Sequence, residues 1–143
     1  GALEGRILGA PSLALSTVAD ADDAQFAVAA TVALRLSHEV LSRGLPFEGL
    51  LNVNVPRAPG GYRVTRQGRR VFREGLVARQ DPKGREYYWI GLAPSEWQPD
   101  PLADHAAVSA GLVSVTPLHA DMTFHPAIPA IRDWGLPAEW TPS

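Results

Sequence analysis

Asp22 and Asp23 are adjacent carboxylates, the type of side chain that holds hard divalent cations in proteins. They directly precede residues 24–42, in which apolar side chains recur at three-to-four spacing. At the start of a helix, carboxylates accept hydrogen bonds from free backbone N–H groups and favour the positive end of the helix dipole. We therefore predict that the two aspartates cap a helix, and we assign no metal ligand in this chain.

The four histidines offer no second route to a metal site, because none is paired at a spacing such as H-x-x-x-H. His119 differs from the other histidines in its position, because it follows a strand at the end of a sheet, where binding and catalytic sites often lie. We keep it as a candidate cleft residue and expect the others to be structural or solvated. Ser16 and Thr17 end a strand with no His or Asp partner placed by the sequence, so nucleophilic catalysis is not favoured.

Basic residues are concentrated in one stretch of the chain. Nine of the thirteen Lys and Arg residues lie in the stretch from Arg57 to Arg85. The net charge of that stretch is about +7, and the net charge of the rest of the chain is about −9. One interpretation is a solvated hairpin whose arginines protect exposed strand edges. The other is a funnel that steers phosphorylated substrates. The candidate steering residues are Arg63, Arg66, Arg69 and Arg70.

The elements that would position these residues are predicted to alternate between strand and helix. Strands are expected at residues 13–16 and 50–55, joined by the helix 24–42 in a right-handed parallel crossover. A second helix, 101–110 with Asp100 as its N-cap, leads into a strand at 113–116 that Pro117 should end. The pattern predicts an α/β fold in which the three strands share one sheet, with the helix 24–42 packed on it.

Residues 57–100 follow a different pattern, in which strands are joined by turns and not by helices. Strands at 71–77 and 85–90 flank Asp-Pro-Lys-Gly at 81–84, which has the residue preferences of a type I turn, so a hairpin is predicted. A two-stranded hairpin is marginally stable alone, and the aromatic run at 87–89 supplies apolar area for a contact.

Composition limits the remaining classes of protein. A chain of 143 residues, 45% hydrophobic, is the size of one domain. It has no cysteine, which excludes disulfides and thiolate metal sites and agrees with a reducing, cytoplasmic compartment. No apolar run approaches the ~20 residues of a membrane span and no signal peptide is visible, so no membrane partner is expected. Gly1 is not an initiator methionine, and the chain is expected to begin inside a helix.

Three motifs together resemble the SurE (survival protein E) nucleotidase family. ADHAAVSAGLVSVTPLHADMT, at 103–123, is similar to that family's T-D-x-x-A-V-x-x-G-Y-V-S-V-T-P-L-H-x-D-x-T, with Ala103 in place of Thr and Leu112 in place of an aromatic. LNVNVP at 51–56 matches a second signature. The opening residues match a helix A-A-x-E-G-x-x-x-G followed by P-A-L-A-V-S. The resemblance covers residues 2–123.

The resemblance implies a partial Rossmann-like SurE fold, with helices packed on a sheet, and a protruding β-hairpin arm. Residues 1–56 would be the second half of the α/β core, 57–100 the arm and its loops, and 101–123 the helix and strand that return to the core. Residues 124–143 would form a tail with at most a short helix. In the family the arm packs against another subunit, which implies a homodimer or tetramer.

The implied activity is metal-dependent hydrolysis of nucleoside 5′- or 3′-monophosphates with Mg²⁺ or Mn²⁺, and nucleic acid or polyphosphate are further implied partners. The family's metal site includes N-D-D-G in its amino-terminal half, but no Asn precedes Asp22 and no Gly follows Asp23. We therefore expect residues 1–143 to bind no metal and to be inactive alone. Asp104 matches the family's T-D position and is a candidate cleft residue, the alternative being an ordinary first-turn carboxylate. The alternative function is a non-catalytic oligomerisation module derived from that family.

Overall fold

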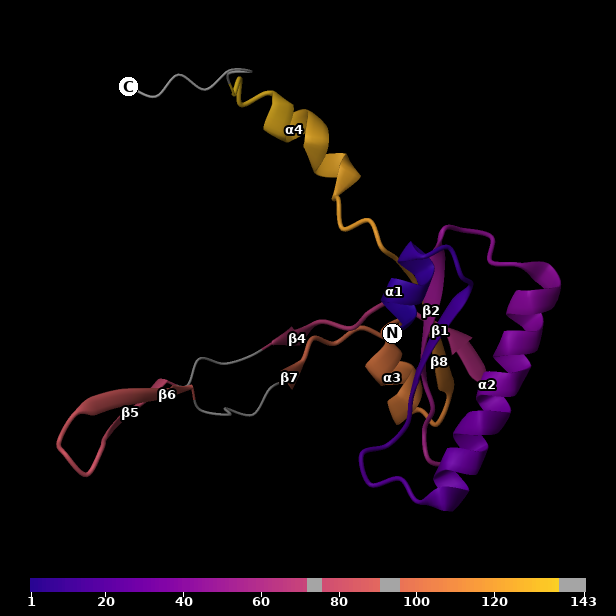
Figure 1. Cartoon of the computed structure of the whole chain (residues 1–143), viewed down its shortest axis with the longest axis horizontal. Helices are drawn as coiled ribbons and strands as arrows, with labels where there is room; N and C mark the ends of the chain where they lie inside the picture. Colours follow the sequence, from indigo (N-terminus) through magenta and orange to yellow (C-terminus); the bar gives the residue numbers. More distant parts are fainter. Residues whose placement is uncertain (72–75, 91–95, 137–143) are drawn as a thin grey trace.

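The computed structural model describes residues 1–71, 76–90 and 96–136 (Figure 1). Its main sheet has the strand order β1-β2-β8-β3. β1 and β2 run parallel, β8 is antiparallel to β2, and β3 is parallel to β8. The sheet is therefore mixed. The strands are β1 (Ser12–Ser16), β2 (Gly49–Asn54), β8 (Val113–His119) and β3 (Tyr62–Val64).

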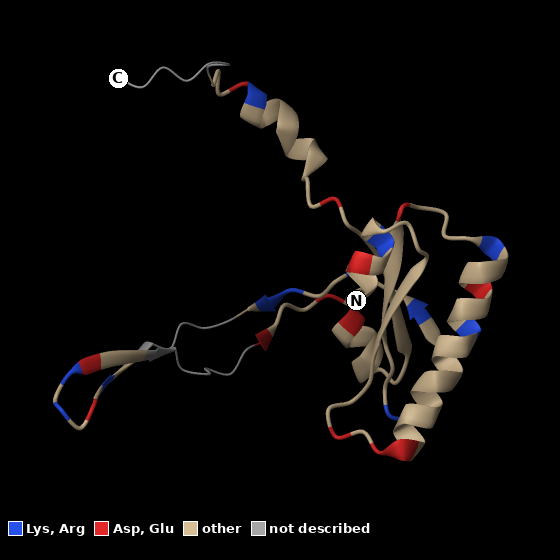
Figure 2. Ribbon diagram, viewed as in Figure 1, with Lys and Arg blue, Asp and Glu red and all other residues tan. Residues whose placement is uncertain are grey.

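Helix α2 (Asp23–Arg43) makes the crossover between β1 and β2, as predicted. Asp22 is its N-cap, and the Asp22 Oδ1 atom accepts a hydrogen bond from the Gln25 N–H at 2.8 Å. The helix ends at Gly44, whose φ of 74° is readily available only to glycine. Figure 2 shows acidic residues where α2 begins and a basic residue where it ends, the arrangement that the helix dipole favours. The predicted capping role is confirmed for Asp22.

The face of the sheet toward α2 is apolar. Val53 and Val55 of the β2 segment and Val113 of β8 are buried against Ala29 and Val32 of the helix. Burying a valine side chain contributes about 1.5–3 kcal/mol, so this cluster is a main source of the sheet's stability. The predicted packing of this helix on the three strands is confirmed.

The opposite face is polar and carries helices α1 (Ala2–Ile7) and α3 (Asp104–Ser109) (Figure 1). Thr65, Ser114 and Thr116 are buried, and the Thr65 and Thr116 hydroxyls form a hydrogen bond of 2.7 Å. At the start of α3, Ala103 and Ala107 are fully buried, because only small side chains let a helix lie this close to the sheet. The sheet therefore separates an apolar core from a polar layer.

Two boundaries differ from those predicted. β8 continues through Pro117 to His119. Because β3 ends opposite Val115, the side of β8 that faces β3 is a free sheet edge at Pro117. The missing N–H of a proline costs little at such an edge. Helix α3 begins at Asp104 rather than at residue 101. Asp100 does not cap it and instead accepts a hydrogen bond from the Leu102 N–H at 3.0 Å.

The arm extends away from the sheet (Figure 1). At its base β4 (Arg70–Val71) pairs with β7 (Glu96–Trp97), and further out β5 (Leu76–Gln80) pairs with β6 (Glu86–Ile90), all antiparallel. The predicted hairpin is present, with Asp81 N–H bonded to the Arg85 carbonyl and Gly84 at φ 77°. Residues 72–75 of the strand predicted at 71–77 lie outside the described residues. β3, which the sequence grouped with the arm, belongs to the main sheet.

The carboxyl-terminal segment leaves the sheet after β8. It contains the short helices η1 (His125–Ala127) and α4 (Ile128–Arg132), with none of their residues buried. No helix in the described part of the chain is both long and apolar enough to cross a membrane.

Candidate functional site

A row of hydrogen-bonded polar side chains crosses the sheet where β1 and β2 end and β8 begins. The Ser16 hydroxyl donates to Asn54 Oδ1 at 2.7 Å, and Asn54 Nδ2 donates to Ser114 Oγ at 3.0 Å. Asn54 faces this side because strand residues alternate, so that Val53 and Val55 point to the core. In open α/β sheets, ligands bind outside the carboxyl ends of the parallel strands, which is the edge that this row occupies.

A cleft of about 330 Å³ opens beside Asn54, between α3 and the base of the arm. Its walls combine hydrogen-bonding groups with apolar surface. They are formed by Asn54, Trp97, Asp104, His105, Val108 and Ser109. β2 therefore meets β7 and α3 here, although more than 40 residues separate it from them in the sequence.

Asp104 is half-buried and fixed by two backbone N–H groups. Its Oδ1 atom accepts from the His105 N–H at 2.7 Å and from the Gly68 N–H at 3.0 Å. Gly68 can come this close to α3 because it has no side chain. An added Cβ would lie only 2.6 Å from His105 Cδ2. The candidate Asp104 therefore lines this cleft, with one carboxylate oxygen oriented by two backbone N–H groups.

His105 lies beneath Trp97, which comes from the base of the arm. The two rings stack with centroids 4.7 Å apart and planes 14° from parallel, and the Arg70 guanidinium lies 5.5 Å from the Trp97 ring centroid. His105 Nε2 is buried and has no hydrogen-bond partner among the described residues. No sequence pattern singled out His105, because its stacking partner Trp97 is 8 residues away in a strand whereas His105 lies in a helix. The stack joins the arm to α3 at the cleft wall.

Arg66 and Asp100 connect the two chain segments that lead into and out of the arm. Arg66 Nε and Nη2 donate to the two carboxylate oxygens of Asp100 at 2.6 and 2.9 Å. The hydrogen bond from Arg66 lowers the pKa of Asp100, the Leu102 N–H lowers it further, and the pKa of Arg66 is raised in return. The positive charge of this candidate steering residue is therefore largely compensated by its partner.

The other candidates are dispersed. Arg63 lies opposite Ser114 in the register of β3 and β8, which places it on the polar face near the row. Arg69 is exposed at the base of the arm. His119 lies opposite Gly49, at the other end of β2 from Asn54, because β8 runs antiparallel to β2. The structure therefore does not bring His119 together with Asp104, and a role for His119 in a cleft stays a prediction.

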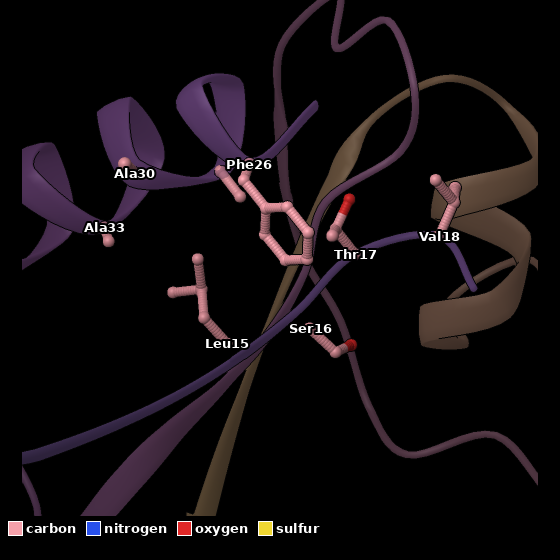
Figure 3. Close-up of a pocket in the computed structure, with 8 residues that line it drawn as sticks. Leu15, Ser16, Thr17, Val18, Phe26, Ala30 and Ala33 are labelled. Atoms are coloured by element: carbon pink, nitrogen blue, oxygen red, sulfur yellow. The ribbon is translucent and has the colours of Figure 1, made fainter. Parts of the chain in front are cut away.

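A second hollow, on the other side of β1, has a different character. Figure 3 shows Phe26, Ala30 and Ala33 of α2 facing Leu15 across it, with Ser16 and Thr17 at one end. Its volume is about 430 Å³ and its walls are mainly apolar. Because few polar groups line this hollow, it is better suited to apolar packing than to a catalytic site.

The described residues do not by themselves fit a divalent cation. Among residues 1–71, 76–90 and 96–136, no three His, Cys, Asp or Glu side chains gather in a group that could hold a metal ion. The side-chain oxygens of Ser16, Asn54 and Ser114 are neutral, and each takes part in a hydrogen bond of the row, whereas hard cations prefer several oxygens that include carboxylates. We therefore derive no chemical step through a metal on these residues.

A mixed sheet with a parallel crossover, a helix on one face and a polar cleft at the carboxyl edge defines a Rossmann-like α/β protein. The family model for survival protein SurE matches residues 1–74, which is half of the chain, and the chain belongs to the SurE family. The crystal structure of SurE from Aquifex aeolicus is similar, with a TM-score of 0.78 and 37% identity over 94% of this chain and 56% of that one.

Curated relatives agree with this assignment. The 5′-nucleotidase SurE of Symbiobacterium thermophilum is 44% identical over 139 residues, which are 94% of this chain and 54% of the relative. That of Geobacter metallireducens is 42% identical over 144 residues, 98% of this chain and 57% of the relative. The chain thus spans about half the length of the curated relatives that it matches.

Proposed function

We propose that the full-length protein is a 5′-nucleotidase, a phosphoric monoester hydrolase acting on nucleoside 5′- or 3′-monophosphates. The observation that carries this proposal is the identity of about 40% with relatives named 5′-nucleotidase SurE over nearly all of these 143 residues. The cleft at the carboxyl edge supports it, because it places polar groups where α/β folds bind substrates.

In this proposal residues 1–143 form one wall of the substrate site. Asn54 and Asp104 contact the substrate. Arg63 of β3 and the arginines of the arm base attract its phosphate by their summed charge, Arg63 most directly because it lies on the same face of the sheet as Ser114. A divalent cation, Mg²⁺ or Mn²⁺, would supply Lewis-acid stabilisation of the phosphate and an activated water. We place its carboxylate ligands outside the described residues, since these hold no suitable group of three.

The proposal extends to assembly and location. The side chains of Tyr87 and Tyr88 are 42% and 64% exposed on a two-stranded arm, which favours a partner subunit as their cover and hence a homodimer or tetramer. The absence of cysteine agrees with a cytoplasmic protein.

Phosphate release tests the function. The full-length protein should hydrolyse a nucleoside monophosphate in saturating Mg²⁺ or Mn²⁺, whereas residues 1–143 purified alone should not. The matched variant carries Asp22→Ala and Asp23→Ala in residues 1–143. Turnover by residues 1–143 that disappears in this variant would contradict both the capping role and the placement of the metal ligands. A full-length protein without activity would favour the alternative, an oligomerisation module.

A further inference from the structure

Gln25 is a buried polar side chain in the apolar face of α2. It is 4% exposed and lies on the same side of the helix as Ala29 and Val32, which pack against the sheet. A buried amide without hydrogen bonds would destabilise the fold, and an apolar side chain of similar size would fill the same space without that cost. The hydrogen bonds of this amide therefore indicate what the residue does.

The side-chain amide of Gln25 joins the ends of two neighbouring strands. Its Nε2 atom donates to Thr17 Oγ1 at 2.6 Å and to the Pro56 carbonyl oxygen at 3.1 Å. Thr17 directly follows β1, and Pro56 lies just beyond the end of β2. Both hydrogens of the amide group are used in this way. The side chain therefore connects α2 to the carboxyl ends of β1 and β2.

The direction of these hydrogen bonds is determined by the partners of Gln25. A carbonyl oxygen only accepts, so the nitrogen of the amide must face Pro56. The Thr17 hydroxyl donates to the Val55 carbonyl at 3.1 Å, and its oxygen is then available to accept from Gln25. The position therefore requires a donor of two hydrogen bonds, which a side chain that only accepts cannot replace.

These bonds lie where the ladder between β1 and β2 ends. Ser16 and Asn54 are the last pair of the two strands, and the Val55 N–H donates to the Ser16 carbonyl at 2.9 Å just beyond them. The ends of elements open more easily than their centres. The same pair carries the hydrogen bond of 2.7 Å from the Ser16 hydroxyl to Asn54 Oδ1. A clamp on the residues that follow this pair would limit the movement of Asn54 at the cleft.

We propose that Gln25 is a positioning residue, whose side-chain amide holds the carboxyl ends of β1 and β2 together and thereby fixes Asn54 for contact with the substrate. The proposal rests on the proposed function, in which Asn54 contacts the substrate, and adds a residue of α2 that is not part of the cleft wall. Gln25 acts through Thr17 and Pro56 and touches no reacting atom.

Steady-state phosphate release by the full-length protein tests the positioning role. Gln25→Met keeps the length of the side chain and removes both donors, and we expect kcat/KM to fall about 3- to 10-fold, the range of one neutral hydrogen bond. Val40→Ala is the matched control, because Val40 is buried near the other end of the same helix and its truncation lowers stability away from the cleft. In this control kcat/KM should be unchanged.

A double-mutant cycle separates positioning from a general loss of stability. If Gln25 acts through Asn54, Gln25→Met should cause no further loss of kcat/KM once Asn54→Ala is present. Additive losses, or an equal loss in Val40→Ala, would overturn the proposal. If Gln25→Met fails to fold, Thr17→Val takes its place in the cycle with the same expectation, because it removes the hydroxyl that links the Gln25 amide to Val55.

Hydrogen exchange of the Asn54 and Val55 backbone amides separates this proposal from the proposed function. Measured by mass spectrometry on the full-length protein, exchange should be about 5-fold or more faster in Gln25→Met than in Val40→Ala, the effect of losing two neutral hydrogen bonds. Equal exchange in the two variants would refute the clamp even in an active nucleotidase. A protein that releases no phosphate would contradict the proposed function, and the exchange rates would still decide the clamp.

Discussion

Asn54 holds three strands together through one side chain. It accepts a hydrogen bond from Ser16 on β1 and donates one to Ser114 on β8, whose side chain is fully buried. A buried hydroxyl that loses its partner keeps its desolvation penalty. The row that borders the cleft therefore also stabilises the sheet.

We expect Asn54→Ala to lower the free energy of unfolding of the full-length protein by about 1–3 kcal/mol, the cost of leaving the Ser114 hydroxyl without this partner. Urea unfolding followed by circular dichroism measures the change. Asn52→Ala is the matched control, since Asn52 lies on the same face and makes no side-chain hydrogen bond within the described residues. A loss no larger than that of the control would show that the row contributes nothing to stability.

Asp100 should titrate below its usual range because Arg66 binds its charged form. A folded-state pKa below the unfolded value of about 3.9 means that the pair stabilises the fold fully above that value, and that this stabilisation is lost as pH falls through the lower, folded pKa. Carbon-detected NMR titration of the Asp100 carboxyl measures this. Arg66→Ala should raise the pKa toward 3.9, whereas Arg69→Ala should leave it in place. An Asp100 that titrates normally in the unsubstituted protein would contradict the geometry.

At the scale of elements, the cleft depends on a close contact between the loop after β3 and the start of α3. Gly68, in the loop between β3 and β4, lies against His105 and Asp104. Trp97 of β7 stacks on His105. Each element is short, so none would hold this arrangement alone. The contact fixes both Asp104 and the direction in which the arm leaves the body.

Gly68→Ala should therefore destabilise the full-length protein by about 1–3 kcal/mol, because its Cβ would lie 2.6 Å from His105 Cδ2 and 2.8 Å from Asp104 Oδ1. Thermal unfolding by calorimetry measures the effect. Gly60→Ala is the control, since its Cβ would meet nothing closer than the Gly111 carbonyl at 3.8 Å. Equal melting temperatures for the two variants would show that the contact has room to relax.

At the scale of the whole molecule, the arm and the carboxyl-terminal segment extend from the sheet (Figure 1). Both segments carry exposed apolar side chains. Val77, Tyr87 and Tyr88 on the arm are examples, and Ile131 and Trp134 are others beyond β8. A two-stranded ribbon has too little of its own core to keep such groups from water, which favours contacts with another chain.

Deletion of residues 71–90 should lower the oligomeric mass of the full-length protein, because it removes the aromatic surface that a partner subunit would cover. Light scattering coupled to size exclusion gives the mass. The double variant Tyr87→Ser and Tyr88→Ser keeps the length of the arm and should weaken assembly in the same direction. An unchanged mass in both variants would count against assembly through the arm.

The sequence by itself determined much of the local structure. Apolar spacing placed α2, the Asp-Pro-Lys-Gly turn placed the β5–β6 hairpin, and Asp22 before an amphipathic segment indicated an N-cap. These features depend on interactions between residues that are close in the sequence, so a short stretch of sequence is enough to predict them. The motifs at 51–56 and 103–123 also indicated the family, which the comparison with known proteins then established.

Only the tertiary structure decided which residues share a site. Strand direction is a long-range property, and the antiparallel pairing of β8 with β2 placed Ser114 beside Asn54 while it carried His119 to the opposite edge. The sequence predicted a strand at 50–55, but not that the Asn54 side chain would meet α3 and Trp97 at a cleft. Likewise, Arg66 became a partner of Asp100 through a contact across 34 residues. Contacts of this range depend on how the elements pack, and no single stretch of sequence specifies them.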